Sequence, residues 1–282
     1  MISSLAQVKN TQRTQTRTYT AYASSPFHAL ALAGGTVYAA GQNTSGECTV
    51  PVAAQSGVSA IDAAFNVSFA LKSGAVLAWG SSAYSLTTVP VAAQTGVTQI
   101  SAALNHILCI KGNNVIGWGS NGGGQLNIPS ALTDNTAGLT QVVAGSGASL
   151  ALKNGRVYGW GGWLDSTTIP SNLLTGVSQI GMWFDNTAFA LKSGTVYAFG
   201  SNTNLDAAFL SGVTAISKFG PNFAALKGTA GWYLASGGAR TGADLNASGL
   251  TCFAGYSAGC FIKNGELWLN GLNDYGQSNF DY

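Results

Sequence analysis

Charged side chains are scarce in this chain. Asp, Glu, Lys and Arg make up 8% of its 282 residues, where about a quarter is usual for globular proteins. The formal net charge is +2, and residues 1–20 supply Lys9, Arg13 and Arg17 without an acid, so the remainder sums to 2 − 3 = −1. Because binding of phosphates requires several clustered cations, we expect no nucleic-acid partner. The basic arm is instead a candidate for docking on an acidic neighbour.

Residues that carry out chemistry are also few. The chain has two histidines, His28 and His106, and its ten acids are spread along the sequence without a close pair. Metal sites need several His, Cys or carboxylate ligands together, and glycosidases need two neighbouring carboxyl groups. Gly122–Gly124 lacks the Gly-Lys-Ser/Thr that completes a phosphate-binding loop. We therefore predict a non-enzymatic protein without metal or cofactor, and we place His106 in a loop.

The four cysteines, Cys48, Cys109, Cys252 and Cys260, match no zinc or redox motif. Cys109 lies in an apolar run and is expected in the core. Cys252 and Cys260 could face each other across a hairpin. Whether they pair stays open, because nothing in the sequence indicates an oxidising compartment.

Long apolar runs are missing as well. No stretch approaches the ~20 residues that a membrane helix needs, so we expect no membrane insertion. The first residues, Met1 to Gln7, show no basic region followed by an apolar region. We therefore predict that the chain has no secretory signal peptide.

Glycine is abundant, with 38 residues, and much of it marks a repeat. The segment Phe69–Gly80 returns at 108–119, 150–161 and 189–200, with weaker copies at 30–41, 224–237 and 261–271. The copies close on Gly41, Gly80, Gly119, Gly161, Gly200, Gly237 and Gly271. This spacing of about 40 residues is typical of the blades of a β-propeller.

Each repeat can be divided into strands. In the second repeat the predicted strands are Val58–Ile61, Ser68–Lys72 and Ala75–Trp79, with Thr87–Val89 as a short outer strand ended by Pro90. Tight hairpin turns are indicated by Ser73-Gly74, Asn154-Gly155, Ser193-Gly194 and Asn264-Gly265. The predicted fold is all-β: one seven-bladed β-propeller over residues 19–282, with about 39 residues per four-stranded blade. An extended N-terminal arm, residues 1–18, precedes it.

Two more positions recur in the repeat. An aromatic side chain fills one of them at Trp79, Trp118, Trp160 and Phe199, and we interpret it as packing between blades. A lysine precedes the hairpin turn at Lys72, Lys111, Lys153, Lys192, Lys227 and Lys263. We interpret these lysines as solvated hairpin ends.

The segment Trp118–Leu126, which reads WGSNGGGQL, resembles the glycine-rich signature of the regulator of chromosome condensation repeats. The segments Thr49–Val58, Ala70–Lys72 and Ala78–Gly80 resemble a short-repeat bacterial branch that includes secreted β-lactamase inhibitory proteins. The resemblance covers nearly the whole chain. It implies a propeller with one face of loops that binds a partner protein, although fold and function separate easily in propellers.

By this resemblance the binding loops lie between the first and second strands of each repeat. The candidate residues are Phe65, Asn66, Leu104, Asn105, Trp183, Phe184, Asp185, Phe219 and Tyr256, with Phe27, Ser146 and Gly147 in the corresponding loops of other repeats. Trp183-Phe184-Asp185 stands out, because one extra residue would push two aromatic side chains outward beside an acid, as in interface anchors. Inward packing of Trp183 is the alternative.

Composition and the missing signal peptide predict a non-enzymatic binding module of a bacteriophage virion, at a tail, fibre or capsid-decoration position. It would reach the outside with the particle, and its partner would be a neighbouring virion protein or a host surface protein or glycan. One alternative is a soluble inhibitor or regulator of an enzyme, which the resemblance implies. A glycan-binding adhesin is another, since exposed aromatics suit sugars as well as proteins. Nucleotide exchange on a small GTPase ranks below these.

Overall fold

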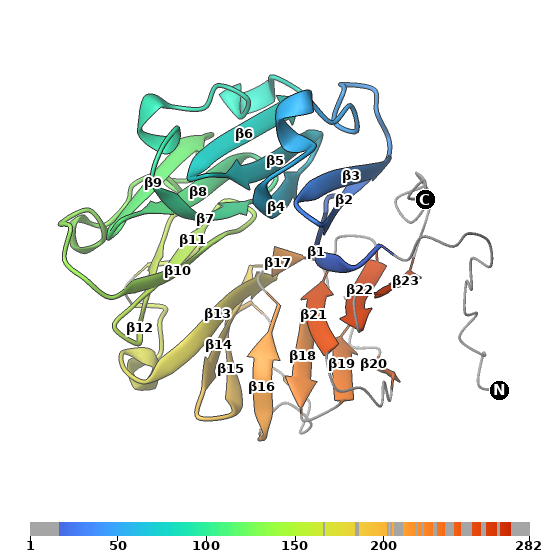
Figure 1. The fold of residues 1–282 in the computed structure, drawn as a ribbon. Helices are drawn as coiled ribbons and strands as arrows, with labels where there is room; N and C mark the ends of the chain where they lie inside the picture. The colour runs from blue at the N-terminus through green and yellow to red at the C-terminus, as the bar shows by residue number, and fades with distance from the viewer. Residues whose placement is uncertain are drawn as a thin grey trace.

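The computed structural model describes residues 17–165, 167–183, 186–201, 203, 205, 211–217, 219–220, 223–227, 230–234, 240–243, 250–254, 258–263 and 266–271. Regular structure in these residues consists of β-strands and short 3-10 helices. The described strands form separate sheets, five of three strands and two of four. The sheets are arranged around a common centre, as in a propeller (Figure 1).

The first sheet contains β1 (Tyr19–Ser24), β2 (His28–Ala33) and β3 (Thr36–Gly41). The second contains β4 (Val58–Ala64), β5 (Val67–Lys72) and β6 (Ala75–Gly80), and the third β7 (Val97–Ala102), β8 (His106–Lys111) and β9 (Asn114–Gly119). The fourth contains β10 (Leu139–Ala144), β11 (Ser149–Lys153) and β12 (Arg156–Trp160). The strands predicted in the second repeat are confirmed, and the first of them continues to Ala64.

The fifth sheet contains β13 (Val177–Trp183), β14 (Thr187–Lys192), β15 (Thr195–Gly200) and β17 (Phe219–Gly220). The sixth contains β16 (Val213–Ile216), β18 (Phe223–Lys227), β19 (Ala230–Leu234) and β20 (Arg240–Ala243). The seventh contains β21 (Leu250–Ala254), β22 (Ala258–Lys263) and β23 (Glu266–Gly271). Pairing is antiparallel throughout, except that β17 pairs parallel with β13. In Figure 1 the strands β4, β7, β10 and β13 lie toward the centre.

The core lies between neighbouring sheets. In the middle strand β5, Phe69 packs with Ile107 of the third sheet, and Ala70 packs with Leu30 of the first. Successive side chains of a strand point to opposite faces, and here both faces are covered. This is why the middle strands are continuous apolar runs and the repeat is easy to see in the sequence. Trp79 is buried in the same layer as Leu30, which confirms its interpretation as packing between sheets.

The tight hairpins are confirmed where the structure describes them. Ser73 and Gly74 have φ of 50° and 79°, as the primed turns require. Asn154-Gly155 and Ser193-Gly194 also have positive φ at both residues, whereas Asn264-Gly265 lies outside the described residues. The closing glycines have a separate cause: Gly119 has φ of 110°, and a Cβ there would lie 2.6 Å from the Asn105 carbonyl oxygen. Only glycine fits both conditions.

The predicted outer strand Thr87–Val89 is not a strand in the structure, and β6 is the last strand of its sheet. The chain instead forms short 3-10 helices, η1 (Val52–Ala54), η2 (Ala83–Ser85), η3 (Val91–Ala93), η4 (Ser130–Leu132) and η5 (Ser171–Leu173). Pro90 cannot donate a hydrogen bond, and its carbonyl accepts from Ala93. The segment therefore satisfies its main chain locally. In the described residues a fourth outer strand, β20, occurs in the sixth sheet.

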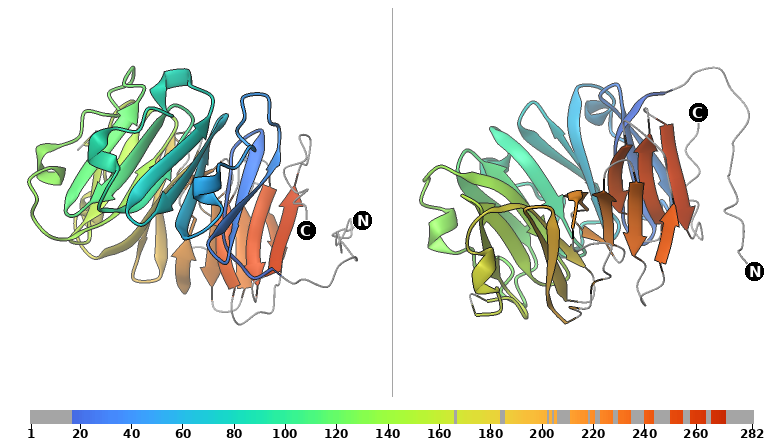
Figure 2. Two further views of the ribbon diagram at one scale, coloured as in Figure 1. Left: turned by 45° about the horizontal axis from the view of Figure 1, so that its top comes forward. Right: turned by 90° about the horizontal axis from the view of Figure 1, so that it is seen from below.

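The strand ends define two faces of the molecule (Figure 2). One end carries the turns between first and second strands together with the exit loops 42–50, 81–89 and 120–128. The two sets of loops are in contact there, since the Ser81 N–H donates to the Asn66 carbonyl and the Ser120 N–H to the Asn105 carbonyl. We call this end the loop face. We call hairpin face the opposite end, where Val97 N–H donates to the Gly74 carbonyl. The helices η1, η3, η4 and η5 lie there, just before β4, β7, β10 and β13.

Candidate functional site

An aromatic pair, half-buried Phe27 and exposed Phe65, spans the first and second sheets on the loop face. Phe27 lies in the turn between β1 and β2, and Phe65 lies in the turn between β4 and β5. Their ring centroids are 4.8 Å apart and the planes meet at 88°, an edge-to-face arrangement. Phe65 is 44% exposed. The repeat thus places two aromatic side chains from equivalent turns of neighbouring sheets in direct contact.

Local hydrogen bonds fix the turn that carries Phe27. The Ser25 hydroxyl oxygen accepts from the backbone N–H groups of Phe27, at 3.3 Å, and of His28, at 3.2 Å. A serine that satisfies the main chain in this way holds a turn without a regular element. The turn therefore presents Phe27 in a defined position beside Phe65.

A buried hydrogen-bonded chain lies beneath the aromatic pair. Ser25 Oγ is 2.9 Å from His28 Nδ1, and His28 Nε2 is 2.8 Å from Ser68 Oγ in the next sheet. The Ser68 hydroxyl donates to the Glu47 carbonyl at 2.7 Å, and the same oxygen accepts from Trp79 Nε1 at 2.9 Å. Because the Ser68 hydroxyl already donates its hydrogen to the Glu47 carbonyl, the hydrogen bond between His28 and Ser68 is donated by His28 Nε2. The network ties the first sheet and its exit loop to the second.

The same chain recurs two sheets further on. His106 Nε2 is 3.0 Å from Ser149 Oγ, whose hydroxyl donates to the Gln125 carbonyl at 2.9 Å, and Trp160 Nε1 donates to that carbonyl as well. The prediction that His106 is a loop side chain is therefore wrong: it begins β8 and is fully buried. Sequence alone could not show this, because its partner Ser149 is 43 residues away.

Burial keeps both imidazoles neutral. Desolvation lowers the pKa of His28 to about 4, while a hydrogen bond with the Phe65 backbone acts in the opposite direction. Desolvation also lowers the pKa of His106 to about 4. A neutral, fully hydrogen-bonded histidine between two sheets serves structure rather than acid–base catalysis at neutral pH.

Glu47 occupies an unusual position in the exit loop of the first sheet. Its side chain is fully buried, and Oε2 accepts from the Ser45 N–H at 2.7 Å. Its Oε1 is buried without a hydrogen-bond partner among the described residues. Gln125 fills the corresponding place in the third exit loop, where Oε1 accepts from the Gly123 N–H at 2.8 Å. The two loops therefore share one conformation, and Glu47 carries a carboxylate where its counterpart has an amide.

The other predicted binding residues fall into three groups. Asn66, Leu104, Asn105, Ser146 and Gly147 lie on the loop face and are half-buried. The side chain of Phe219 is not described, but its backbone pairs with Met182. Phe184, Asp185 and Tyr256 lie outside the described residues.

Trp183 points into the protein, the alternative that the sequence left open. It is 4% exposed and its ring centroid is 5.8 Å from that of Phe189. The expected outward push fails for this residue because β13 extends through Trp183 and pairs with β17 at that point. The turn therefore begins after the tryptophan.

Tyr84 is an exposed aromatic on the loop face that the sequence reasoning missed. It lies in the second exit loop and is 60% exposed. Tyr84 and Ser85 have φ of 55° and 56°, a region that side chains other than glycine rarely adopt. Counting back from the proline that ends each exit loop, Ser85 stands where Gly46 and Gly124 stand in its counterparts. This substitution of glycine was the available signal.

Four of the six recurrent lysines are not the solvated hairpin ends that the sequence predicts. Lys72, Lys111 and Lys192 donate to carbonyls of the 3-10 helices, at Ala53, Ala92 and Asn172, over 2.9, 2.9 and 2.6 Å. Lys153 reaches Ala131 in the same way and forms a 2.8 Å salt bridge with Asp134. Each ammonium group therefore holds the connection before its own sheet, because it satisfies carbonyl groups that a short 3-10 helix leaves free.

The innermost strands are joined by side chains that reach across to the next sheet. Gln141 donates to the Ile180 carbonyl at 2.7 Å and accepts from the Ile180 N–H at 2.8 Å. Gln99 contacts Val142 in the same two-point manner, and Gln179 accepts from the Ile216 N–H. These amides satisfy the open edges of the inner strands. We call them the inter-sheet amides.

The predicted arm residue Arg17 is described, whereas Lys9 and Arg13 lie outside the described residues. The Arg17 guanidinium lies 4.1 Å from the centroid of the Tyr38 ring in β3, a cation–π contact. Arg17 thus contacts the first sheet of its own chain.

Cys48 and Cys109 are free thiols. Cys109 is fully buried, as predicted, and burial raises its pKa to about 12. Burial and the charge of Glu47 raise the pKa of Cys48 to about 11. In the register of β21 and β22, Cys252 is opposite Phe261 and Cys260 opposite Phe253, so the two are not cross-strand partners.

Within the described ranges, no three His, Cys, Asp or Glu side chains gather where they could hold a metal ion. None of the helices in that part of the chain is long and apolar enough to cross a membrane.

Comparison with known structures establishes the fold. The chain resembles human WBSCR16 with a TM-score of 0.65 at 14% identity, over 91% of this chain and 87% of that one. It resembles Prp20p from Saccharomyces cerevisiae with a TM-score of 0.57 at 14% identity, over 77% and 71%. The receptor kinase CR4 ectodomain from Physcomitrella patens gives 0.65 at 17% identity, over 90% and 74%.

The solved neighbours include RCC1-like β-propellers, and at these identities the likeness shows the fold alone. No protein-family model matches the chain, and no curated protein matches it.

Proposed function

We propose that this chain is a non-enzymatic, seven-bladed propeller that binds a protein partner through its loop face. The aromatic pair of exposed Phe65 and half-buried Phe27 carries this proposal. Exposed aromatic side chains anchor protein interfaces because they bury much apolar area at little cost in side-chain entropy. Tyr84, in the exit loop of the same sheet as Phe65, is another exposed aromatic side chain on this face.

Two further observations support a protein partner. The structurally similar Prp20p has been studied for its binding to Gsp1p and histones. On the hairpin face Lys72, Lys111 and Lys192 are bound to main-chain carbonyls, so these three side chains are already engaged within the chain. We propose that Asn66, Leu104 and Asn105 border the aromatic pair.

Phe184, Asp185 and Tyr256 are proposed as further contributors to this face, because the repeat places them in equivalent turns. Phe219 is proposed to contribute from β17, which pairs with the end of β13. Lys9, Arg13 and Arg17 are proposed as a separate docking element, with Arg17 fixing it to the first sheet.

Site-specific photo-crosslinking tests the proposal. A photoreactive phenylalanine analogue replaces Phe65 in one variant and Val91 in the other. Val91 is the matched control, because it is 81% exposed and lies on η3 at the hairpin face. We expect one discrete adduct from position 65, with an identified protein, and none from position 91. Equal adducts from both positions, or none from position 65, would remove the loop face as the binding site.

A place in a bacteriophage virion is a finer proposal, supported by the charge-poor composition and the basic arm. Mass spectrometry of purified particles and of culture supernatant tests it. A stoichiometric copy number in the particles is expected. Presence only as a free protein would exclude a structural role in the virion and leave the loop-face proposal intact.

A further inference from the structure

Two buried oxygen atoms at the junction of the first and second sheets have no hydrogen-bond partner among the described residues. They are Oε1 of Glu47, in the exit loop 42–50, and Oδ1 of Asn66, in the turn between β4 and β5. Glu47 is fully buried, and its other carboxylate oxygen, Oε2, accepts from the Ser45 N–H at 2.7 Å. Both unpaired atoms are hydrogen-bond acceptors. Each therefore needs a donor or a cation.

Glu47 and Asn66 are neighbours across this junction. Both lie against Gly80, the closing glycine of the second sheet, where a Cβ would be 3.2 Å from Cβ of Glu47 and 2.4 Å from the Asn66 carbonyl oxygen. The Glu47 carbonyl also accepts from the hydroxyl of Ser68, two residues after Asn66, at 2.7 Å. The two unpaired oxygens thus belong to side chains that start from the same small part of the loop face.

Glu47 has no cationic partner in the part of the chain that the structure describes. The salt bridge found there joins Lys153 to Asp134, and His28, in the hydrogen-bonded chain that ends at the Glu47 carbonyl, is neutral. A buried carboxylate without a counter-charge is strongly unfavourable, and a cation held against it restores neutrality. One carboxylate balances a monovalent ion, whereas a divalent ion would leave a positive charge in excess. Carboxylate and amide carbonyl oxygens are ligands that suit hard metal cations.

The related exit loops lack this combination. In the third loop Gln125 stands in the place of Glu47, and the turn of the fourth sheet has Gly147 in the place of Asn66. The amide of Gln125 is uncharged and both donates and accepts, so it needs no ion. In the second loop the corresponding residue is the apolar Leu86, whose carbonyl accepts from a tryptophan as that of Glu47 does. Of these three loops, the first alone buries a carboxylate.

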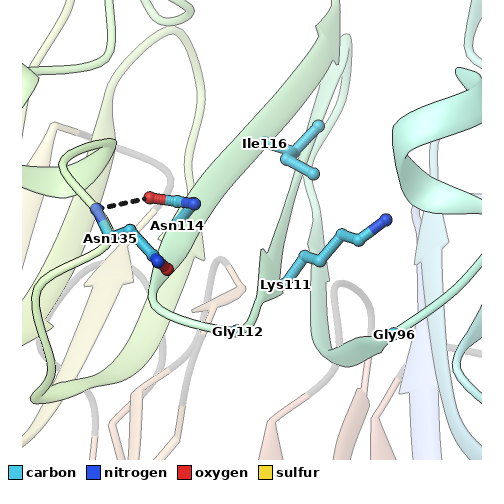
Figure 3. Close-up of a pocket in the computed structure, with 6 residues that line it drawn as sticks. All are labelled: Gly96, Lys111, Gly112, Asn114, Ile116 and Asn135. Carbon is cyan, nitrogen blue, oxygen red and sulfur yellow. Dashed lines mark hydrogen bonds between the residues drawn. The ribbon is translucent and has the colours of Figure 1, made fainter.

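The pocket of about 470 Å³ beside the start of β9 differs in this respect (Figure 3). Its ammonium group, from Lys111, donates to the Ala92 carbonyl at 2.9 Å. Asn114 Oδ1 accepts from the Asn135 N–H at 2.9 Å, the contact drawn as a dashed line in Figure 3. These polar groups are engaged within the chain, whereas the carboxylate of the first exit loop is only half-satisfied.

We propose that Glu47 and Asn66 hold a monovalent metal cation, sodium or potassium, between the first exit loop and the second sheet. Glu47 Oε1 and Asn66 Oδ1 are two of its ligands, and the ion neutralises the buried carboxylate. Residues 43–45 of the loop are exposed, so the ion reaches the site from the loop face. It joins the exit loop to the turn that carries Phe65. The site does not depend on the partner proposed for the loop face.

Urea unfolding of the full chain in sodium, potassium or choline chloride tests the proposal, with the total salt held constant so that ionic strength does not change. Choline is too large for a site between a carboxylate and an amide oxygen. Because the ion binds the folded chain alone, the folding equilibrium constant of the wild-type chain should rise up to tenfold for each tenfold increase of the cation. The salt that gives the larger rise identifies the ion.

Three variants make the test specific. Glu47→Gln places the residue of the third exit loop in the first and should abolish the rise. Asn66→Ala removes one ligand and should shift the rise to higher cation concentration. The matched control, Asp165→Asn, removes an exposed acid from the loop after the fourth sheet and should behave like the wild-type chain.

In choline chloride Glu47→Gln should be more stable than the wild-type chain, and this advantage should shrink as sodium or potassium is added. An equal cation dependence of the wild-type chain and Glu47→Gln would reveal a general salt effect and overturn the proposal. The same wild-type stability in all three salts would also overturn it, and would show that a hydrogen-bond donor pairs with Glu47 instead. Neither result bears on the Phe27–Phe65 site, which the photo-crosslinking experiment tests.

Discussion

Two buried histidines join neighbouring sheets, and their burial determines their protonation state. His28 and His106 each bridge two sheets through a serine, at 2.8 and 3.0 Å. Both are fully buried and neutral. A proton on either imidazole would place a charge where burial disfavours it. The folded protein therefore resists protonation of these two groups, and the unfolded chain does not.

Stability should consequently fall in acid. The ordinary imidazole pKa is 6.5 and the folded values are about 4, so between these pH values the unfolded chain binds protons that the folded chain does not. The stabilisation is complete above pH 6.5 and is lost as the pH falls toward 4, by about 1.4 kcal/mol per pH unit for each histidine. Urea unfolding across this range measures the slope. His28→Gln should remove about half of it, and an unchanged slope would contradict the assignment.

Glu47 supplies a second prediction at this scale. Its buried Oε1 has no hydrogen-bond partner among the described residues, whereas Gln125 holds the equivalent place as an amide. Removing a buried, half-satisfied charge without changing the shape of the side chain should stabilise the fold, so Glu47→Gln is expected to raise the free energy of unfolding by about 1 kcal/mol. Gln125→Glu is the reciprocal control and should lower it. A destabilised Glu47→Gln variant would show that the carboxylate is required.

At the scale of elements, the inter-sheet amides determine how one sheet docks on the next. Gln141 makes two hydrogen bonds to Ile180, at 2.7 and 2.8 Å. Gln141→Leu keeps the size of the side chain but leaves one N–H and one C=O of β13 unsatisfied, which should cost about 2 kcal/mol. Chemical denaturation measures this loss. Gln141→Glu keeps the acceptor for the Ile180 N–H but sets a carboxylate oxygen against the Ile180 carbonyl, so its cost should be at least as large as that of Gln141→Leu.

Elements that depend on neighbours in sequence were predictable. Apolar runs between turn residues gave the strands, and Ser73-Gly74 gave the hairpin, because the positive φ of a primed turn is encoded in the turn itself. The missing outer strand shows the limit. Thr87–Val89 has β-branched residues, but Pro90 and the 3-10 helix after it redirect the main chain.

The functional site was less predictable, because its contacts join residues that are distant in the sequence. The loop that carries Phe65 could be found from the repeat, but its contact with Phe27 required the spacing of two sheets. The same reason explains three other residues. The sequence analysis placed His106 in a loop and Lys72 at a solvated hairpin end, and it overlooked Gln141. Their partners, respectively Ser149, Ala53 and Ile180, lie in other elements. The inward position of Trp183 has a different cause: β13 pairs with β17 as far as this residue, so Trp183 belongs to the strand and not to the loop.

At the scale of the whole molecule, the two faces differ in chemistry. On the hairpin face the ammonium groups of Lys72, Lys111 and Lys192 are bound to main-chain carbonyls. On the loop face Phe27 and Phe65 lie in turns and Tyr84 lies in an exit loop, and Phe65 and Tyr84 are exposed. Under the proposed function, the loops at one end of the propeller would bind the partner.

The affinity of the cross-linked partner for loop-face variants tests this account most directly. Phe65→Ser removes the more exposed ring of the pair, and Val91→Ser changes an exposed apolar residue on the opposite face. Isothermal titration calorimetry should show that Phe65→Ser weakens binding about thirtyfold, the effect of losing about 2 kcal/mol at an anchor residue, while Val91→Ser leaves the affinity unchanged. Equal affinities for the wild-type chain and Phe65→Ser, with a loss for Val91→Ser, would place the binding site on the hairpin face and contradict the account.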